Sequence, residues 1–420
     1  MICKYTVENF KAIGKKVEVD FYANMNIKRF DFNLTQVGYK NILKSTGFYG
    51  PNNTGKSCIL LSIYGLIAIM LGQPHNNFKN AFANMGEVTK YSVEYVIDGR
   101  FYIYSVEFNN ATRMYEAESL YRREYSDNSK QDTRIFERKK SGLSWHNMLS
   151  DYKNLGVASL FSPAYPFMLL YNIETDELIN QAKKDYLTFA SSILFLRMDG
   201  PIDISKTISL MQKDQKAAIF VKVFVKNCDI LISDFGFDDN VVSDTNINEE
   251  LQTIMNNPAF IKESLKFYSK HKGYRVPSVF FDSVGTQKLI ALSGYIYEAI
   301  HDGKILLVDE IDSSLHHIIT KAIVAMFNNV LNQKAQLIFT THDVLLMNLK
   351  TLLRKDQVWL VDMNEESSSD VTRMSSAFTA RSEDGIRGDE DITDYYLKGR
   401  FGSIPSPDLF ASLEEVSVDE

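Results

Sequence analysis

The sequence predicts an α/β fold with a mixed central sheet, an antiparallel β layer and a helical insertion. Three observations support this prediction. A glycine-rich loop at residues 50–57 stands between a short apolar run, which we expect to be a buried strand, and a long apolar run, which we expect to be a buried helix. Alternating apolar residues at 91–108 predict antiparallel strands. A further apolar run at 304–310 ends in two acids and is typical of a strand buried on both faces.

The composition is that of a folded protein, with 45% hydrophobic and 24% charged residues in 420. The net charge of −7 argues against non-specific coating of nucleic acid. Three scattered cysteines predict neither a metal site nor a disulfide framework, and they favour a cytoplasmic protein. The N-terminus lacks the apolar core of a signal peptide. We expect no membrane segment, because the most apolar run, residues 58–71, is too short to span a bilayer.

Four regions are expected along the chain. Residues 1–150 would form the N-terminal half, with the glycine-rich loop and the antiparallel layer, and residues 151–272 a helical insertion. Residues 273–363 would complete the fold, and residues 364–420 would form a mobile loop and a C-terminal segment. Predicted hairpins have turns near Gly14 and at Asp98-Gly99, a favoured turn dipeptide. We interpret the many tyrosines here as a half-buried sheet face rather than an aromatic platform for a ligand.

The insertion is expected to be mostly helical. The spacing of apolar residues predicts helices over 175–197, 204–229 and 248–270, followed by a strand at 274–281. One helix face is partly basic, with Lys213, Lys216, Lys222 and Lys226. Such a face is usually only solvated, and contact with DNA, RNA or an acidic partner is the alternative.

The glycine-rich loop matches the phosphate-binding pattern G-x-x-x-x-G-K-[ST]. Its backbone N–H groups would converge on a phosphate at the N-terminus of the following helix, where the helix dipole adds positive potential. Lys56 would reach the β- and γ-phosphates, and the Ser57 hydroxyl would bind Mg²⁺. The residues predicted to hold the nucleotide are Gly50, Asn52, Asn53, Thr54, Gly55, Lys56 and Ser57. An ordinary glycine turn is the alternative, and three later motifs count against it.

The first of these motifs is the acidic end of the apolar run at 304–310, which matches a Walker B strand. Asp309 would hold Mg²⁺ through water, and Glu310 would orient or deprotonate the attacking water. A core strand capped by surface acids is the alternative.

The second motif, residues 282–287, is similar to the signature loop of ABC-type ATPases. In that family a serine hydroxyl and a glycine backbone contact the γ-phosphate held by another subunit, and the similarity implies these roles for Ser283 and Gly285. Val284 departs from the family's usual glycine. Residues 313–316 partly match the family's D-loop, with His316 where aspartate is commoner. The third motif ends in His342, which matches the H-loop histidine that contacts the γ-phosphate. We cannot assign the glutamine of the family's Q-loop. It would be sought in the β layer before residue 145, where Glu118 is only a guess for this position.

Together these motifs resemble the ABC-type ATPases of the SMC/RecF/OLD kind, and most closely the stand-alone AAA-family ATP-binding proteins of prokaryotic anti-phage and abortive-infection systems. The resemblance is carried by residues 5–10, 50–57, 283–287, 306–312, 315–316, 340–343 and 396–402. It implies ATP and Mg²⁺ as cofactors, a catalytic set of Lys56, Glu310 and His342, and nucleotide sites completed head-to-tail in a homodimer or higher homo-oligomer.

Two functions follow from this resemblance. The first is a sensor or scaffold with slow ATP hydrolysis that controls an effector in anti-phage defence. Only about eighty residues follow His342, with no acidic cluster of the TOPRIM kind. We therefore expect a separately encoded effector, a TOPRIM-type nuclease or another toxin. The alternative is a RecF/SMC-like ATPase that binds DNA in repair or clamping.

Overall fold

The computed structural model describes residues 1–74, 86–126, 129–140, 142–148, 162–171, 176–200, 203–228, 232, 234–237, 267–271, 273–364, 368–377 and 392–398 of the chain. The chain divides into two compact units. The N-terminal unit comprises Ile2–Ala190 and Thr340–Glu420, and the central unit comprises Ser191–Phe339 with Met1. This division differs from the expected regions, because part of the expected insertion groups with the N-terminal unit. The expected domain boundaries stay a prediction.

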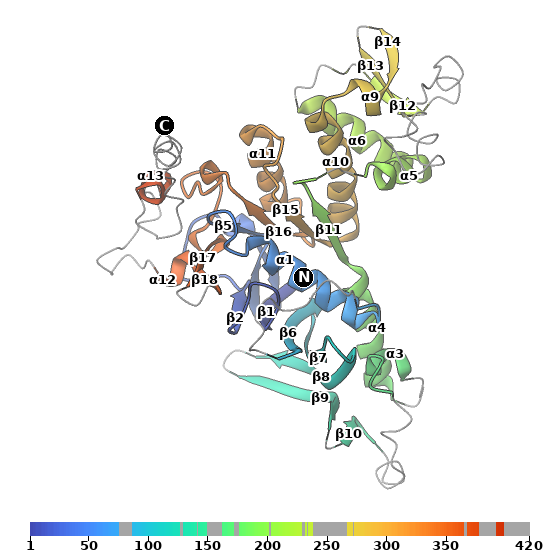
Figure 1. Ribbon diagram of the computed structural model, residues 1–420, viewed down its shortest axis with the longest axis vertical. Coiled ribbons are helices and arrows are strands. Elements are labelled where there is room, and N and C mark those ends of the chain that lie inside the picture. Colours follow the sequence, from blue (N-terminus) through green and yellow to red (C-terminus); the bar gives the residue numbers. More distant parts are fainter. Residues whose placement is uncertain are drawn as a thin grey trace, which may run out of the picture. The chain divides into compact units, whose positions relative to one another are not determined.

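A seven-stranded antiparallel sheet forms much of the N-terminal unit, in the order β10-β9-β8-β7-β6-β1-β2 (Figure 1). Its strands are β1 (Ile2–Glu8), β2 (Val17–Asp20), β6 (Val88–Ile97), β7 (Arg100–Asn109), β8 (Met114–Tyr125), β9 (Lys130–Lys139) and β10 (Gly142–Trp145). Both predicted hairpins, β1–β2 and β6–β7, are confirmed. Asp98 and Gly99 have φ of 46° and 80°, as a two-residue hairpin turn with a matching twist requires.

The helices of this unit are α1 (Lys56–Met70), α3 (Phe167–Leu170), α4 (Glu177–Ser191), α12 (Met374–Ala377) and α13 (Ile392–Leu397). Most tyrosines of the sheet are buried, among them Tyr5, Tyr95, Tyr102 and Tyr104. Tyr95 stacks on Phe189 of α4 with ring centroids 4.0 Å apart. The Tyr5 hydroxyl donates to Ser62 of α1 at 2.8 Å. The sheet-face interpretation is therefore confirmed, and the sheet supports the helix that begins at the glycine-rich loop.

A mixed sheet, as expected, also lies in the N-terminal unit. β5 (Ser45–Tyr49) pairs in parallel with β17 (Val358–Met363), and β17 pairs antiparallel with β18 (Ser369–Arg373). β3 (Leu34–Val37) and β4 (Lys40–Leu43) form a separate hairpin. β18 and α12 lie within residues 364–391, where we expected a mobile loop. Residues 365–367 and 378–391 of that stretch lie outside the described residues.

A buried ion pair just before β17 holds the chain segment around residues 27–29, which leads to β5. The Arg354 side chain is fully buried and donates to both carboxylate oxygens of Asp356 at 3.0 Å. It also donates to the backbone carbonyls of Ile27 and Arg29, at 3.1 and 2.8 Å. Residues remote in sequence are thus joined beside the strand that delivers the glycine-rich loop.

The central unit contains three parallel strands with β15 in the middle: β11 (Ile193–Arg197), β15 (Ile305–Asp309) and β16 (Gln336–Thr341). Its helices are α5 (Ser205–Lys213), α6 (Gln215–Asn227), α9 (Ser278–Phe281), α10 (Val284–Asp302) and α11 (His317–Asn328). A small antiparallel sheet comprises β12 (Asp234–Phe237), β13 (Phe267–His271) and β14 (Tyr274–Pro277). Among the described residues, no helix has the length and apolarity to cross a bilayer.

Several predicted elements were wrong in extent. The helix expected over 175–197 ends at Ser191, and the apolar run after it is β11, paired with β15. The helix expected over 204–229 is divided at Asp214, whose side chain caps α6 by accepting from the Lys216 amide. The strand expected over 274–281 ends at Pro277, where α9 begins. Of the helix expected over 248–270, only 267–270 are described, and they lie in β13.

Candidate functional site

The glycine-rich loop connects β5 to α1 in the N-terminal unit, and two glycines permit its path. Gly55 caps α1 with φ of 96°, and a Cβ on it would lie 1.9 Å from Ser369 Oγ. A Cβ on Gly50 would lie 2.1 Å from the Val361 carbonyl oxygen. No side chain fits at either position, so glycine alone allows the backbone to approach β17 and β18 this closely. The loop is a backbone cradle at a helix N-terminus.

Lys56 points its ammonium back into this cradle. Its Nζ donates to the carbonyl oxygens of Gly50 and Pro51, at 2.8 and 2.6 Å, and the residue is buried. Thr54 Oγ1 donates to the Pro51 carbonyl at 3.0 Å. A phosphate in the cradle would meet a buried cation together with the first amides of α1. The residues present therefore fit the phosphates of a nucleotide.

The other predicted residues of the loop lie at its tip and at the start of the helix. Asn52 and Asn53 are exposed, and Asn53 has φ of 64°. Ser57 is the second residue of α1 and is half-buried. Their roles in binding nucleotide and Mg²⁺ stay predictions.

Two segments flank the loop through contacts that the sequence analysis did not predict. Asn9 and Lys11, in the turn after β1, have φ of 61° and 47°. Such strain in non-glycine residues is often found at functional sites. The Ala12 carbonyl of this turn accepts from the Ser369 amide at 2.9 Å, and Ser369 also touches Gly55. Over three hundred residues separate these partners in the sequence, so only the fold reveals them.

In the central unit, Asp309 and Glu310 lie at the carboxyl end of β15. Asp309 is buried, whereas Glu310 is half-buried with φ of 54°. The Glu310 carbonyl accepts from the Ser313 amide at 2.9 Å, which closes a turn directly after the strand. This turn holds Glu310 in a left-handed backbone conformation that non-glycine residues adopt rarely. An acid at this position can act on a water molecule beyond the strand end.

The end of β11 adds charged residues that we had not predicted. Arg197 is level with Asp309 in the parallel pairing, and its Nε lies 3.8 Å from Asp309 Oδ2. Its pKa is raised, first by a hydrogen bond to Asp199 and further by the charges of Asp309 and Glu310. The carboxyl ends of parallel strands meet at one sheet edge, which is the usual place for ligands. Because we expected a helix here, this pair was missed.

The predicted signature segment begins α10. Ser283 is the exposed N-cap residue, and its Oγ accepts from the Thr286 amide at 3.2 Å. A Cβ on Gly285 would lie 2.6 Å from the Ser314 carbonyl oxygen. Lys288 donates to the hydroxyls of Ser313 and Ser314, both at 3.2 Å. The central unit therefore brings the signature and D-loop segments together.

His342 and Glu118 differ in exposure. His342 belongs to the N-terminal unit and is exposed directly after β16, so its predicted contact with a γ-phosphate stays a prediction. Glu118 is buried in the antiparallel sheet, where it pairs with Arg138 and accepts from the Tyr104 hydroxyl and the Phe167 amide. Burial raises its pKa. Its carboxylate is engaged by these neighbours, and the guess that it is a Q-loop residue stays untested.

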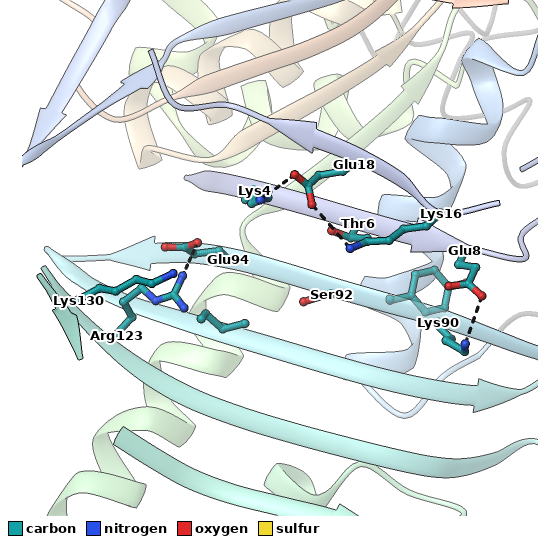
Figure 2. A pocket seen from close by; sticks show the side chains of 12 residues that line it. Lys4, Thr6, Glu8, Lys16, Glu18, Lys90, Ser92, Glu94, Arg123 and Lys130 are labelled. Atoms are coloured by element: carbon teal, nitrogen blue, oxygen red, sulfur yellow. Dashed lines mark hydrogen bonds and ion pairs between the residues drawn. The ribbon is translucent and has the colours of Figure 1, made fainter. Parts of the chain in front are cut away.

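A hollow of about 520 Å³ lies on the other face of this sheet (Figure 2). Charged side chains from neighbouring strands line it and pair with one another. These pairs include Lys4 with Glu18 at 2.8 Å, Lys90 with Glu8 at 3.2 Å and Arg123 with Glu94 at 3.1 Å. Such cross-strand pairs stabilise a solvated sheet face. We therefore assign this hollow no ligand.

Comparison with known proteins gives a family. The family model described as "AAA domain, putative AbiEii toxin, Type IV TA system" matches residues 45–348. That range includes the glycine-rich loop, the signature segment, the Walker B strand and His342. Comparison with curated proteins finds no match.

Solved structures similar to this chain include SMC head domains, each covering most of both chains. The SMC head domain from Thermotoga maritima is 14% identical, with 89% of this chain and 98% of that chain covered and a TM-score of 0.39. An SmcHead bound to the C-winged helix domain of ScpA is 14% identical, with 88% and 97% covered and a TM-score of 0.46. An Smc head domain bound to the C-terminal domain of ScpA derived from Pyrococcus furiosus is 13% identical, with 88% and 95% covered and a TM-score of 0.37.

Proposed function

We propose that this chain is an ATP-dependent scaffold in anti-phage defence. The proposal starts from its family: the chain belongs to the AAA domains described as putative AbiEii toxin of type IV toxin–antitoxin systems. In this proposal the chain binds ATP and Mg²⁺, hydrolyses ATP slowly, and holds a separately encoded effector protein whose release follows a phage trigger. The family match agrees with the expected relation to abortive-infection ATPases.

Nucleotide binding is supported by the cradle of the N-terminal unit. Gly50 and Gly55 leave no room for a side chain, and the buried ammonium of Lys56 faces the same space. In our proposal Ser57 and Asp309 hold Mg²⁺, Glu310 acts on the attacking water, and His342 contacts the γ-phosphate. Bound Mg²⁺ would neutralise charge on the phosphates.

The observation that best supports assembly of two copies of the chain is the exposure of the predicted signature segment. Ser283 is exposed at the N-terminus of α10, and the neighbouring apolar side chains Phe281 and Val284 are 64% and 62% exposed. Phe281 and Val284 lie close together in the sequence on either side of Ser283, and grouped exposed apolar side chains can mark a surface that a partner covers. We propose that this surface receives the nucleotide held by a second copy, head-to-tail.

Such a scaffold needs little ATP turnover. Nucleotide that binds only the assembled state shifts the equilibrium toward it, and a preference of about 5.5 kcal/mol moves an assembly from nearly all open to nearly all closed. Hydrolysis would then end the assembled state and so set when the effector is released, and repeated cycles of hydrolysis would not be needed.

The DNA-clamp alternative is favoured by one feature, the exposed lysines Lys213, Lys216 and Lys226 of α5 and α6. The two functions predict different responses to DNA. We would measure ATP hydrolysis by the wild-type chain at low salt, with and without a 40-base-pair duplex (about four helical turns). A scaffold hydrolyses ATP at the same slow rate in both cases. Stimulation by DNA that disappears at high salt, as phosphate contacts do, would contradict the scaffold and support the clamp.

A further inference from the structure

An apolar groove of about 560 Å³ runs between α6 and α11, with α10 contributing Tyr297 to its lining. One wall is formed by α6, where Ile219 and Val223 are 57% and 52% exposed. Ile319 and Met326 line the other wall, on α11. Because these side chains are large, apolar and in contact with solvent, the groove is a candidate interaction surface.

The shape of the groove suits a helix. Its lining residues along α6 recur three and four positions apart from Lys216 to the C-cap residue Cys228, and those on α11 do so from Ile319 to Met326. The α6 stripe is about 18 Å long at 1.5 Å per residue. A third helix of about three turns would fit between two such stripes, with apolar anchors at the same spacing.

The charged residues at the edge of the groove indicate what kind of partner it binds. Lys216 lines the groove. Lys213, three residues before Lys216, and Lys226, next to the lining residue Asn227, are exposed. None of these three lysines forms an ion pair with a described residue, whereas Lys222 is paired with Asp234 at 3.0 Å. Asp214, which accepts from the Tyr297 hydroxyl at 2.7 Å, contributes one negative charge beside these three lysines. The rim is therefore basic.

A basic rim disfavours self-association through this groove, because two copies meeting face to face would bring like charges together. The apolar floor disfavours nucleic acid, which binds through its phosphates. We propose that the groove between α6, α10 and α11 binds an amphipathic helix of a partner protein, with apolar residues facing the groove and acidic residues along its flanks. This inference concerns the central unit alone and does not depend on ATP hydrolysis.

Designed peptides test the proposal on the full chain. A fluorescein-labelled peptide of about sixteen residues would carry Leu at helical positions i, i+4, i+7 and i+11 and Glu on its other faces. Its control has the same leucines, with Lys replacing each Glu. We expect fluorescence anisotropy to show binding of the acidic peptide at least about tenfold tighter than that of the basic peptide. Binding should weaken as salt rises from about 50 to about 300 mM.

Variants locate the binding site. Val223→Asp should weaken the acidic peptide by about tenfold or more, because it places a charge on the apolar wall. Leu331→Asp is the matched control, since Leu331 is 88% exposed and lies outside the groove. It should bind the peptide as the wild type does. Lys216→Glu should reduce the preference for the acidic peptide. Ile219→Asp replaces Val223→Asp if circular dichroism shows that the latter does not fold.

Three results would overturn the inference. The first is absence of binding by the acidic peptide, which would also be the result if the chain's own residues cover the groove. The second is equal affinity for the acidic and basic peptides, or equal loss in the Val223→Asp and Leu331→Asp variants. The third is displacement of the acidic peptide by duplex DNA in a manner that Lys216→Glu abolishes, which would assign the rim to nucleic acid.

Discussion

Gly285, the second residue of α10, lies against the backbone of Ser314, so that a Cβ on Gly285 would stand 2.6 Å from the Ser314 carbonyl oxygen. Lys288, one turn further along α10, donates to the Ser314 hydroxyl at 3.2 Å. Ser314 follows Glu310 by four residues. The predicted signature segment therefore packs against the same short segment that contains Glu310, the residue expected to act on water.

Gly285→Ala tests this connection. The added methyl group must push Ser314 away, and we expect the rate of ATP hydrolysis to fall by about tenfold, or about 1.4 kcal/mol in the barrier. ATP affinity, measured with a fluorescent analogue, should change little because Lys56 and its cradle are untouched. Gly200→Ala is the control, since a Cβ there meets no heavy atom within 4 Å. Equal hydrolysis by both variants would disprove the connection.

Lys56→Ala should remove the buried cation of the cradle. We expect ATP affinity to fall by about 2–5 kcal/mol, because phosphate oxygens would then be desolvated without a charged donor. Isothermal titration calorimetry measures the loss. Lys140→Ala, whose side chain is 82% exposed, serves as the control. Unchanged affinity in Lys56→Ala would show that the cradle does not hold the phosphates.

Arg197→Ala should lower the Mg²⁺ concentration at which ATP hydrolysis reaches half of its maximal rate. The guanidinium lies 3.8 Å from Asp309 Oδ2 and would repel a cation there. The effect should be two- to fivefold, since the Arg197 side chain is 53% exposed and an exposed pair contributes less than about 1 kcal/mol. A Mg²⁺ titration of the hydrolysis rate checks it, with Arg197→Lys expected to resemble the wild type. An unchanged or higher requirement would contradict this role.

Arg354→Ala should destabilise the N-terminal unit. It leaves the buried Asp356 carboxylate without its partner, and breaking such a pair costs about 3–5 kcal/mol. Urea unfolding followed by circular dichroism measures the free energy. The exposed Lys28→Ala should stay within about 0.5 kcal/mol of wild type. A double variant, Arg354→Ala with Asp356→Ala, should recover part of the loss; if it is less stable than the single variant, uncompensated charge is not the cause.

The sequence predicted well those parts that have a local pattern. The glycine-rich loop, the strand β15 and the turn at Asp98-Gly99 depend on residues close together in the chain, and the structure has the predicted elements there. For β11 the sequence predicts the end of a helix, because Ile193 and its apolar neighbours continue the helical spacing of α4. Only pairing with β15, more than a hundred residues away, makes this run a strand.

The flanks of the candidate site were missed for the same reason. Ser369 touches Gly55, and nothing local in a serine-rich stretch predicts that contact. Arg197 is adjacent to Asp309 only through the register of two parallel strands. Long-range pairing of this kind cannot be inferred from periodicity, which records which face of an element is buried and not which element covers it.

Nucleotide-driven assembly of two copies is the central claim, and light scattering on Glu310→Gln tests it most directly. This variant should bind ATP without hydrolysing it and so accumulate the assembled state. With ATP and Mg²⁺ we predict a mass at least twice that of the single chain, the same with or without a 40-base-pair duplex (about four helical turns). The double variant Lys56→Ala with Glu310→Gln should not respond to ATP. A mass of one chain while ATP is demonstrably bound would contradict the account.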